Sequence, residues 1–182
     1  MEARDEQIDL LVTTARAELP YIKVAFERLV PLIYPGLRHL ATGITGSLAA
    51  ADNVAQDVIL RVMHGLPRLK QTISFPGWLR KITVNACNTW LSKEKRERKK
   101  LELFYSESND SVDRSEAEDE NKSFNEIVGD LNFDDRTIVS LKILNDLEFA
   151  EIAEVTGMSL SATKMRYYRA LEKIKLRHSD QD

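Results

Sequence analysis

The chain has 182 residues, of which 43% are hydrophobic and 30% charged, a composition that suits one large soluble domain or two small ones. Its single cysteine, Cys87, excludes an intramolecular disulfide and a metal site built from several cysteines, and it fits a reducing cytoplasm. No apolar run is as long as a membrane span, and the acidic N-terminus "MEARDEQIDLL" is unlike a signal peptide.

The net charge of -3 hides three zones of opposite sign. Residues 61–100 contain eleven Lys or Arg and two acids, and residues 163–177 contain six Lys or Arg and one acid. Between them, residues 105–121 contain seven acids and one arginine. Two basic zones flank an acidic one, so the overall charge is misleadingly mild.

The first part of the chain is predicted to be helical, because apolar residues recur at three- and four-residue spacing over 5–18 and again over 21–43. Pro31 and Pro35 are expected to bend or interrupt the second of these helices. The stretch "TGITGS", 42–47, is predicted to be a turn.

A third helix is predicted from Ala51 to Gly65, followed by a basic loop over 64–74. Its buried candidates are Val54, Val58, Leu60, Val62 and Met63. Its polar face consists of Asp52, Asn53, Gln56 and Asp57. This face is either ordinary solvated surface or a docking surface for a basic partner helix.

The next helix begins near Ser74, a possible cap, with Pro76 in its first turn. No acid occurs from Val58 to Ser92. At about 100° per residue, one stripe of this helix is an apolar seam made of Leu79, Ile82, Ala86 and Trp90. A neighbouring stripe contains Trp78, Lys81, Asn85 and Ser92, with Asn88 at its edge.

Two interpretations of this second stripe stay open. An aromatic ring, amides and a cation are the groups that hold single-stranded nucleic acid. Alternatively, Trp78 belongs to the core and the cations only make the helix soluble. Trp90 lies on the apolar seam and is expected in the core, as is Cys87 beside it.

Residues 101–122 are rich in Ser, Asp, Glu and Asn and show little periodicity. They are predicted to form a flexible tether, extended by self-repulsion. The tether is either a solvated linker or a polyanion that occupies a channel built for nucleic acid.

Helical apolar sets resume near Phe124, and residues 147–169 have the spacing of a helix-turn-helix. Gly157 would supply the positive φ of the turn, and Ala153 would allow a close helix crossing. Lys164, Arg166 and Arg169 lie on the outer side of the second helix. A helical hairpin with a solvated basic face is the alternative to DNA binding.

Catalysis has little support in the sequence. His39, His64 and His178 lack metal-ligand spacing, and the chain has no glycine-rich phosphate loop and no nucleophile–base set. We therefore expect no enzyme activity, no metal and no cofactor.

Two segments resemble one family. "AADNVAQDVILRVMHGLPRL…SFPGWLRKITVNACNTWL" is similar to the first domain of extracytoplasmic-function (ECF) sigma factors of bacterial RNA polymerase. "LNFDDRTIVSLKILNDLEFAEIAEVTGMSLSATKMRYYRALEKIK" is similar to their second domain. The resemblance implies an all-α fold with two small helical domains, 1–100 and 123–182, joined by the flexible acidic linker 101–122.

The resemblance also implies the role of each site. In the family, the first domain docks on the largest polymerase subunit and opens the minus-ten element, and the second binds the minus-thirty-five element and the second-largest subunit. Residues matching the polymerase docking stretch are Asp52, Asn53, Gln56 and Asp57. Those matching the minus-ten site are Arg68, Lys70, Trp78, Lys81, Asn85 and Asn88. Those matching the minus-thirty-five site are Ser161, Thr163, Lys164, Arg166, Tyr167 and Arg169.

The same resemblance implies a cytoplasmic stress-response factor held inactive by an anti-sigma factor, which in some members is membrane-anchored. Asn53 stands where the family usually has an acid, and Gly77 replaces a more usual Thr. Glu148 stands where a Ser or Thr usually caps, which would pass the capping to Asp146. The competing hypothesis is a stand-alone helix-turn-helix regulator that uses only residues 123–182.

Overall fold

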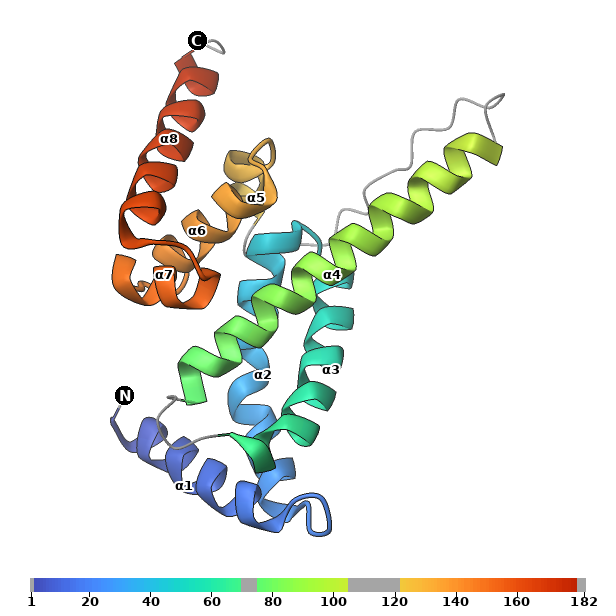
Figure 1. Cartoon of the computed structure of the whole chain (residues 1–182), viewed down its shortest axis with the longest axis vertical. Coiled ribbons are helices and arrows are strands. Elements are labelled where there is room, and N and C mark those ends of the chain that lie inside the picture. Colours follow the sequence, from blue (N-terminus) through green and yellow to red (C-terminus); the bar gives the residue numbers. More distant parts are fainter. Residues whose placement is uncertain (1, 70–74, 105–121, 180–182) are drawn as a thin grey trace.

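The computed structural model describes residues 2–69, 75–104 and 122–179, and helices make up all the regular structure in these ranges (Figure 1). The predicted all-α fold is confirmed. The N-terminal helices are α1 (Glu2–Glu18), α2 (Val24–Thr45), α3 (Leu48–Gly65), the short 3-10 helix η1 (Leu66–Arg68) and α4 (Phe75–Phe104). The C-terminal helices are α5 (Lys122–Val128), α6 (Phe133–Ile143), α7 (Phe149–Thr156) and α8 (Leu160–Ser179).

Helix α2 runs without interruption through both of its prolines, so the predicted break is wrong. Pro31 and Pro35 are exposed, while Leu29, Ile33 and Leu37 on the opposite side are buried. Burial of this apolar stripe outweighs the cost of about 3 kcal/mol for a proline inside a helix.

The predicted turn at 42–47 is shorter in the structure, because α2 continues to Thr45 and α3 already begins at Leu48. Gly46 ends α2 in the left-handed region at φ 75°, and its N–H donates to the Thr42 carbonyl. Ser47 then caps α3 by accepting a hydrogen bond from the Ala50 N–H.

The core of the N-terminal half contains Val54, Val58 and Val62 of α3, as predicted, but Leu60 is 55% exposed. The prediction for Leu60 is wrong because it lies about 200° around the helix from Val58 and from Val62. A large apolar side chain is therefore displayed on the outer face of α3.

Helix α4 packs on α2 and α3 through an inner side that includes the fully buried Thr83 and Cys87, and Trp90 packs partly buried against the same core. Burial raises the pKa of the Cys87 thiol to about 12. The predicted core positions of Cys87 and Trp90 are confirmed. The helix extends to Phe104, so residues 101–104, expected in the tether, are helical; residues 105–121 lie outside the described part.

The C-terminal half contains the predicted helix-turn-helix, formed by α7, a turn at Gly157 and α8. Gly157 has φ 73°, and its N–H donates to the Ala153 carbonyl. Capping of α7 does not pass to Asp146. The Glu151 carboxylate accepts from the Glu148 N–H at 2.9 Å, so Glu148 is the capping residue.

The two halves share one hydrophobic core. Ile138 and Leu141 of α6 and Ile152 of α7 belong to the same buried cluster as the side chains of α2, α3 and α4. Helix α6 packs on α2, and α7 packs on α4 (Figure 1). The sequence, which predicted two domains on a tether, contained no indication of this packing.

The state of Cys87 provides a test of how α4 packs. Because the thiol is fully buried and its pKa is raised, we expect no reaction with a thiol reagent such as DTNB at pH 8 under native conditions. One equivalent should react after unfolding in guanidinium. Rapid stoichiometric labelling of the native chain would contradict the observed packing of α4.

Candidate nucleic-acid and polymerase interfaces

The outer face of α4 displays the predicted minus-ten residues. Lys81, Asn85 and Asn88 are exposed and follow one another at spacings of four and three residues, which places them on one stripe. None of the three forms a side-chain hydrogen bond or ion pair with another described residue. Two amides and one ammonium are therefore available to a ligand along this stripe.

Trp78 lies at the start of α4 in a half-buried position. Its ring is 6.0 Å from that of Phe75, centroid to centroid, and it packs so tightly on Gly65 that a Cβ there would lie 2.9 Å from Trp78 Cζ2. The indole therefore covers the end of α3 and stays partly exposed. Arg68 at the end of η1 is exposed, and Lys70 lies outside the described residues.

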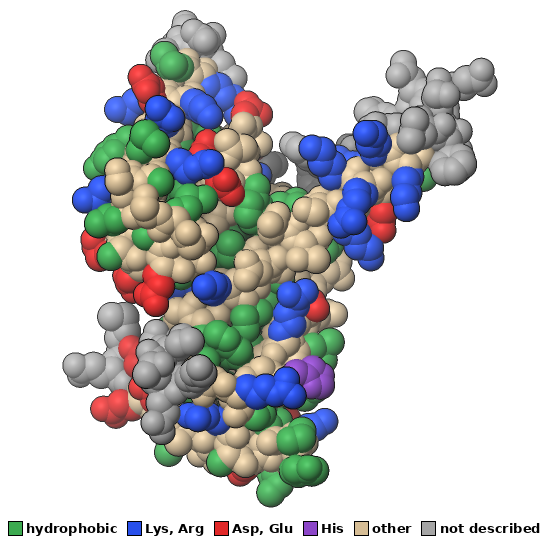
Figure 2. Space-filling model, viewed as in Figure 1, with side chains coloured by type: hydrophobic (Ala, Val, Ile, Leu, Met, Phe, Trp, Pro, Cys, Tyr) green, Lys and Arg blue, Asp and Glu red, His purple; other side chains and the backbone are tan. Residues whose placement is uncertain are grey.

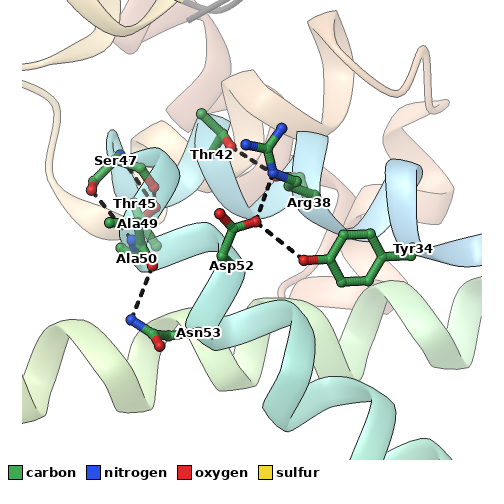
Figure 3. A network of polar contacts seen from close by, with 9 residues as sticks. All are labelled: Tyr34, Arg38, Thr42, Thr45, Ser47, Ala49, Ala50, Asp52 and Asn53. Carbon is green, nitrogen blue, oxygen red and sulfur yellow. Dashed lines mark hydrogen bonds and ion pairs between the residues drawn. The ribbon is translucent and has the colours of Figure 1, made fainter. Parts of the chain in front are cut away.

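The four predicted docking residues all lie on α3 but do not act alike. Asp52 faces α2, where its carboxylate accepts from Arg38 Nε at 2.7 Å and from the Tyr34 hydroxyl at 3.1 Å (Figure 3). Partial burial and the neighbouring Asp52 carboxylate raise the pKa of Tyr34. Asp52 therefore links α3 to α2 through these two hydrogen bonds.

The remaining docking residues face solvent. Asn53 donates to the Ala49 carbonyl in its own helix, and Asp57 pairs with Arg61 at 2.7 Å (Figure 3 shows Asn53). Gln56 is exposed, and Leu60 continues the stripe of Asn53 and Gln56 at spacings of three and four residues. The exposed stripe of α3 thus combines one leucine with two amides. Sequence periodicity alone would have found Leu60 if its angle to Val58 had been considered.

On the helix-turn-helix, the structure divides the predicted minus-thirty-five residues into an outer and an inner group. Ser161, Lys164 and Arg169 are exposed. Thr163 is fully buried, and its hydroxyl donates to the Ser159 carbonyl at 3.0 Å. Tyr167 packs edge-on against Phe149, with ring centroids 5.3 Å apart. Thr163 and Tyr167 therefore support the turn from inside.

Arg166 belongs to the inner group as well, although it was expected on the outer side. Its guanidinium contacts Asp135 at 2.8 Å and Asp134 at 3.1 Å, and Lys173 reaches the same buried Asp135 carboxylate at 3.4 Å. These contacts tie α8 to the start of α6. The charge of Arg166 is thus neutralised within the protein, which a charge count along one helix could not reveal.

Two exposed side chains on α8 were missed by the sequence analysis. Met165 is 48% exposed and Tyr168 is 60% exposed, and both lie between Lys164 and Arg169 on the outer side of the helix. Lys164 lies over the Phe149 ring, with 5.9 Å from Nζ to the centroid. The outer face of α8 is therefore a mixed apolar and cationic surface.

The projecting end of α4 adds a third basic region. Figure 2 shows Lys and Arg side chains gathered along this part of the helix. They are exposed and belong to Lys93, Lys95, Arg96, Arg98, Lys99 and Lys100. Pairs four residues apart, Lys93–Glu97 and Glu94–Arg98, neutralise only part of this charge. The region is suited to a phosphate backbone.

Comparison with known proteins assigns both halves. Residues 27–97 match the family described as Sigma-70 region 2, and residues 122–174 match Sigma-70, region 4. The chain belongs to the ECF sigma factors. Within the described residues, no helix is both long and apolar enough to cross a membrane.

Several curated sigma factors are similar to this one. RNA polymerase sigma factor SigV of Bacillus subtilis is 26% identical over 134 residues, which cover 72% of this chain and 78% of SigV. ECF RNA polymerase sigma factor EcfG of Rhodopseudomonas palustris is 24% identical over 140 residues, 77% of each chain. "Probable RNA polymerase sigma factor RfaY" of Xanthomonas campestris is 27% identical over 173 residues, and this chain covers only 43% of its length.

Solved structures share the fold over both halves. CnrH in complex with the cytosolic domain of CnrY matches with a TM-score of 0.69 and 21% identity, covering 97% of this chain and 99% of that one. The sigma factor RpoE in complex with the anti-sigma factor NepR, from Bartonella quintana, matches with a TM-score of 0.67 and 19% identity, covering 85% of this chain and 96% of that one.

Replacing Arg166 tests whether it holds α8 in place. Arg166→Gln should lower the free energy of unfolding by about 2 kcal/mol, because a charge-assisted hydrogen bond to a buried carboxylate is lost. Lys164→Gln, on the exposed side of the same helix, should change it by less than about 0.5 kcal/mol. Urea unfolding followed by circular dichroism measures both, and equal stabilities would contradict the inner position of Arg166.

Proposed function

We propose that this sigma factor directs core RNA polymerase to promoters by reading the minus-ten element with α4 and the minus-thirty-five element with α8. The observation that carries the proposal is the exposed stripe of Lys81, Asn85 and Asn88 in a helix segment without acids. Together with the outer face of α8, this stripe gives the chain two separate surfaces suited to nucleic acid.

At the minus-ten element, strand opening requires groups that hold unpaired bases. Intact duplex hides the Watson–Crick edges, so a reading surface must offer amides for those edges and rings for stacking. Asn85 and Asn88 supply amides, Lys81 meets phosphate, and the exposed part of Trp78 meets a base. We assign Arg68 and Lys70 to the phosphates of the same opened strand because both are positively charged.

Docking on the largest polymerase subunit uses the outer face of α3. We assign the contact to Asn53, Gln56 and Leu60, with the Asp57–Arg61 pair at the edge. Asp52 contributes indirectly, because its bonds to Arg38 and Tyr34 fix α3 against α2. Leucine supplies the apolar anchor that an interface centre needs, and the amides supply orientation.

At the minus-thirty-five element, we assign DNA contact to the outer face of α8. Lys164 and Arg169 contact phosphates or guanine edges, and Ser161 lies near the N-terminal end that enters the groove. Met165 and Tyr168 offer apolar contact to thymine methyl groups. Arg166, Thr163 and Tyr167 hold the helix in position and do not contact bases.

The division of the chain follows from this assignment. Residues 1–100 and 123–182 form the two functional domains, and the acidic linker 101–122 allows them to separate on polymerase, where the second domain also meets the second-largest subunit. We assign an anti-sigma factor as a further partner, since the similar RpoE was solved in complex with the anti-sigma factor NepR. Because the proposed partners, RNA polymerase and promoter DNA, are cytoplasmic, we assign the protein to the cytoplasm.

Run-off transcription with purified core polymerase over a promoter library tests the proposal. The chain should direct specific transcripts that core polymerase alone does not produce. Absence of transcripts combined with tight binding of promoter DNA by the free chain would favour the stand-alone helix-turn-helix regulator.

The two surfaces of the N-terminal half should be separable by mutation. Asn85→Ala should reduce open-complex formation roughly tenfold, the effect of one lost base contact, without weakening core polymerase binding. Leu60→Asp should weaken core binding, while Leu10→Asp, at another exposed leucine, should not. Permanganate footprinting and a core-binding titration measure the two effects, and identical profiles for Asn85→Ala and Leu60→Asp would contradict the assignment.

Neighbouring residues of α8 should differ in their salt dependence. Lys164→Ala should lower the slope of log affinity against log salt by about 0.9, because one phosphate contact is lost. Met165→Ala should leave that slope unchanged and reduce discrimination among minus-thirty-five sequences. Holoenzyme binding to promoter variants over a salt series measures both. Equal slopes for Lys164→Ala and wild type would contradict the assignment of Lys164 to a phosphate contact.

A further inference from the structure

The first residue of α7, Phe149, contacts two side chains on the outer face of α8. Lys164 Nζ lies 5.9 Å from the centroid of the Phe149 ring, and the Tyr168 ring lies 6.2 Å away, centroid to centroid, at an interplanar angle of 45°. Lys164 and Tyr168 are exposed, whereas Phe149 is half-buried. Neither exposed side chain forms a hydrogen bond or ion pair with another described residue. Aromatic rings are therefore the partners that orient both.

The Phe149 ring is itself fixed from inside the C-terminal half. Tyr167 packs edge-on against it, with 5.3 Å between ring centroids, and Lys142 Nζ of α6 lies 5.6 Å from its centroid. The Lys142 side chain is only 22% exposed and pairs with Glu148, the capping residue of α7, at 3.3 Å. Side chains from three helices thus hold one ring in place, and this ring is a fixed support for Lys164.

An aromatic ring at this position gives interactions that an aliphatic side chain could not. A ring attracts an ammonium through its quadrupole and pairs with another ring in a preferred geometry. A free lysine side chain samples many rotamers, and fixing it at an interface costs free energy. Because Lys164 and Tyr168 are four residues apart, they lie on one stripe of α8, and one ring can orient both. Phe149 therefore reduces the freedom that DNA binding would otherwise have to remove.

We propose that Phe149 is a positioning residue of the minus-thirty-five site, which holds Lys164 and Tyr168 in the orientations in which they meet DNA. The inference rests on the proposed function, because that function assigns DNA contact to the outer face of α8. Phe149 lies on the first helix of the helix-turn-helix and itself contacts no base. Its effect on promoter recognition passes through the two α8 side chains.

Phe149→Leu removes the ring but keeps an apolar side chain against Tyr167. On a promoter selected in the run-off experiment, holoenzyme with this variant should bind about fivefold more weakly than wild type, because a cation–ring contact and a ring pair are both lost. In a chain that already carries Lys164→Ala and Tyr168→Ala, the same substitution should cause no further loss. Phe133→Leu, at a half-buried phenylalanine of α6 outside this aromatic group, provides the matched control and should leave promoter affinity unchanged.

A spectroscopic measurement on the free chain tests the contact without polymerase. In a chain with carbon-13-labelled lysine, the ring current of Phe149 should move the Lys164 Hε resonance upfield, and Phe149→Leu should return it toward the position of an exposed lysine. Lys95, which is exposed on α4, provides that reference and should not change. Circular dichroism confirms that each variant remains helical.

The outcomes separate the positioning role from the proposed function. An equal loss of promoter affinity from Phe149→Leu in the wild-type and the doubly substituted chains would overturn the positioning role, because the ring would then act only through the fold. Unchanged promoter affinity, or an unchanged Lys164 resonance, would overturn it as well. If wild-type holoenzyme binds no promoter at all, the proposed function fails, whereas the lysine spectra still decide whether Phe149 orients Lys164.

Discussion

The two halves of this protein meet where α6 packs directly on the α2 backbone and Arg136 donates a hydrogen bond to the Gly43 carbonyl. Because α6 rests directly on α2, the side chains of α6 and α7 complete the same hydrophobic core that α2, α3 and α4 begin. Two halves that match two different Sigma-70 regions are thus combined in one folded body. Interfaces between domains of one chain are commonly of the reversible kind.

Charge has two different uses in this molecule. Asp52, Asp135 and Arg166 are held in internal networks that fix one helix against another. Lys81, Lys164 and Arg169 remain exposed on faces that lack such partners among the described residues. Arg166 and Asp135 fix α8, the helix that carries Lys164 and Arg169, whereas Asp52 fixes α3 against α2.

Much of this could be predicted from the sequence, because helical periodicity separates inner from outer residues. Angles around α4 placed Trp90 and Cys87 in the core and Asn85 outside it, and the turn at Gly157 follows from the need for positive φ. Arg166 and Asp52 could not be placed, since their carboxylate and guanidinium partners lie on other helices. Gly43 carried no signal for the same reason: its role depends on Leu144, about a hundred residues away. The predicted interruption of α2 at Pro31 was wrong because burial of the apolar stripe outweighed the low helix propensity of proline.

The most direct test of this account is the distance between the two halves, free and on polymerase. Spin labels at Glu27→Cys on α2 and Glu172→Cys on α8, both exposed sites, can be measured by pulsed electron resonance, while buried Cys87 stays unlabelled. The account predicts one narrow distance in the free chain and a longer one after core polymerase is added. An identical distribution in both states would contradict it.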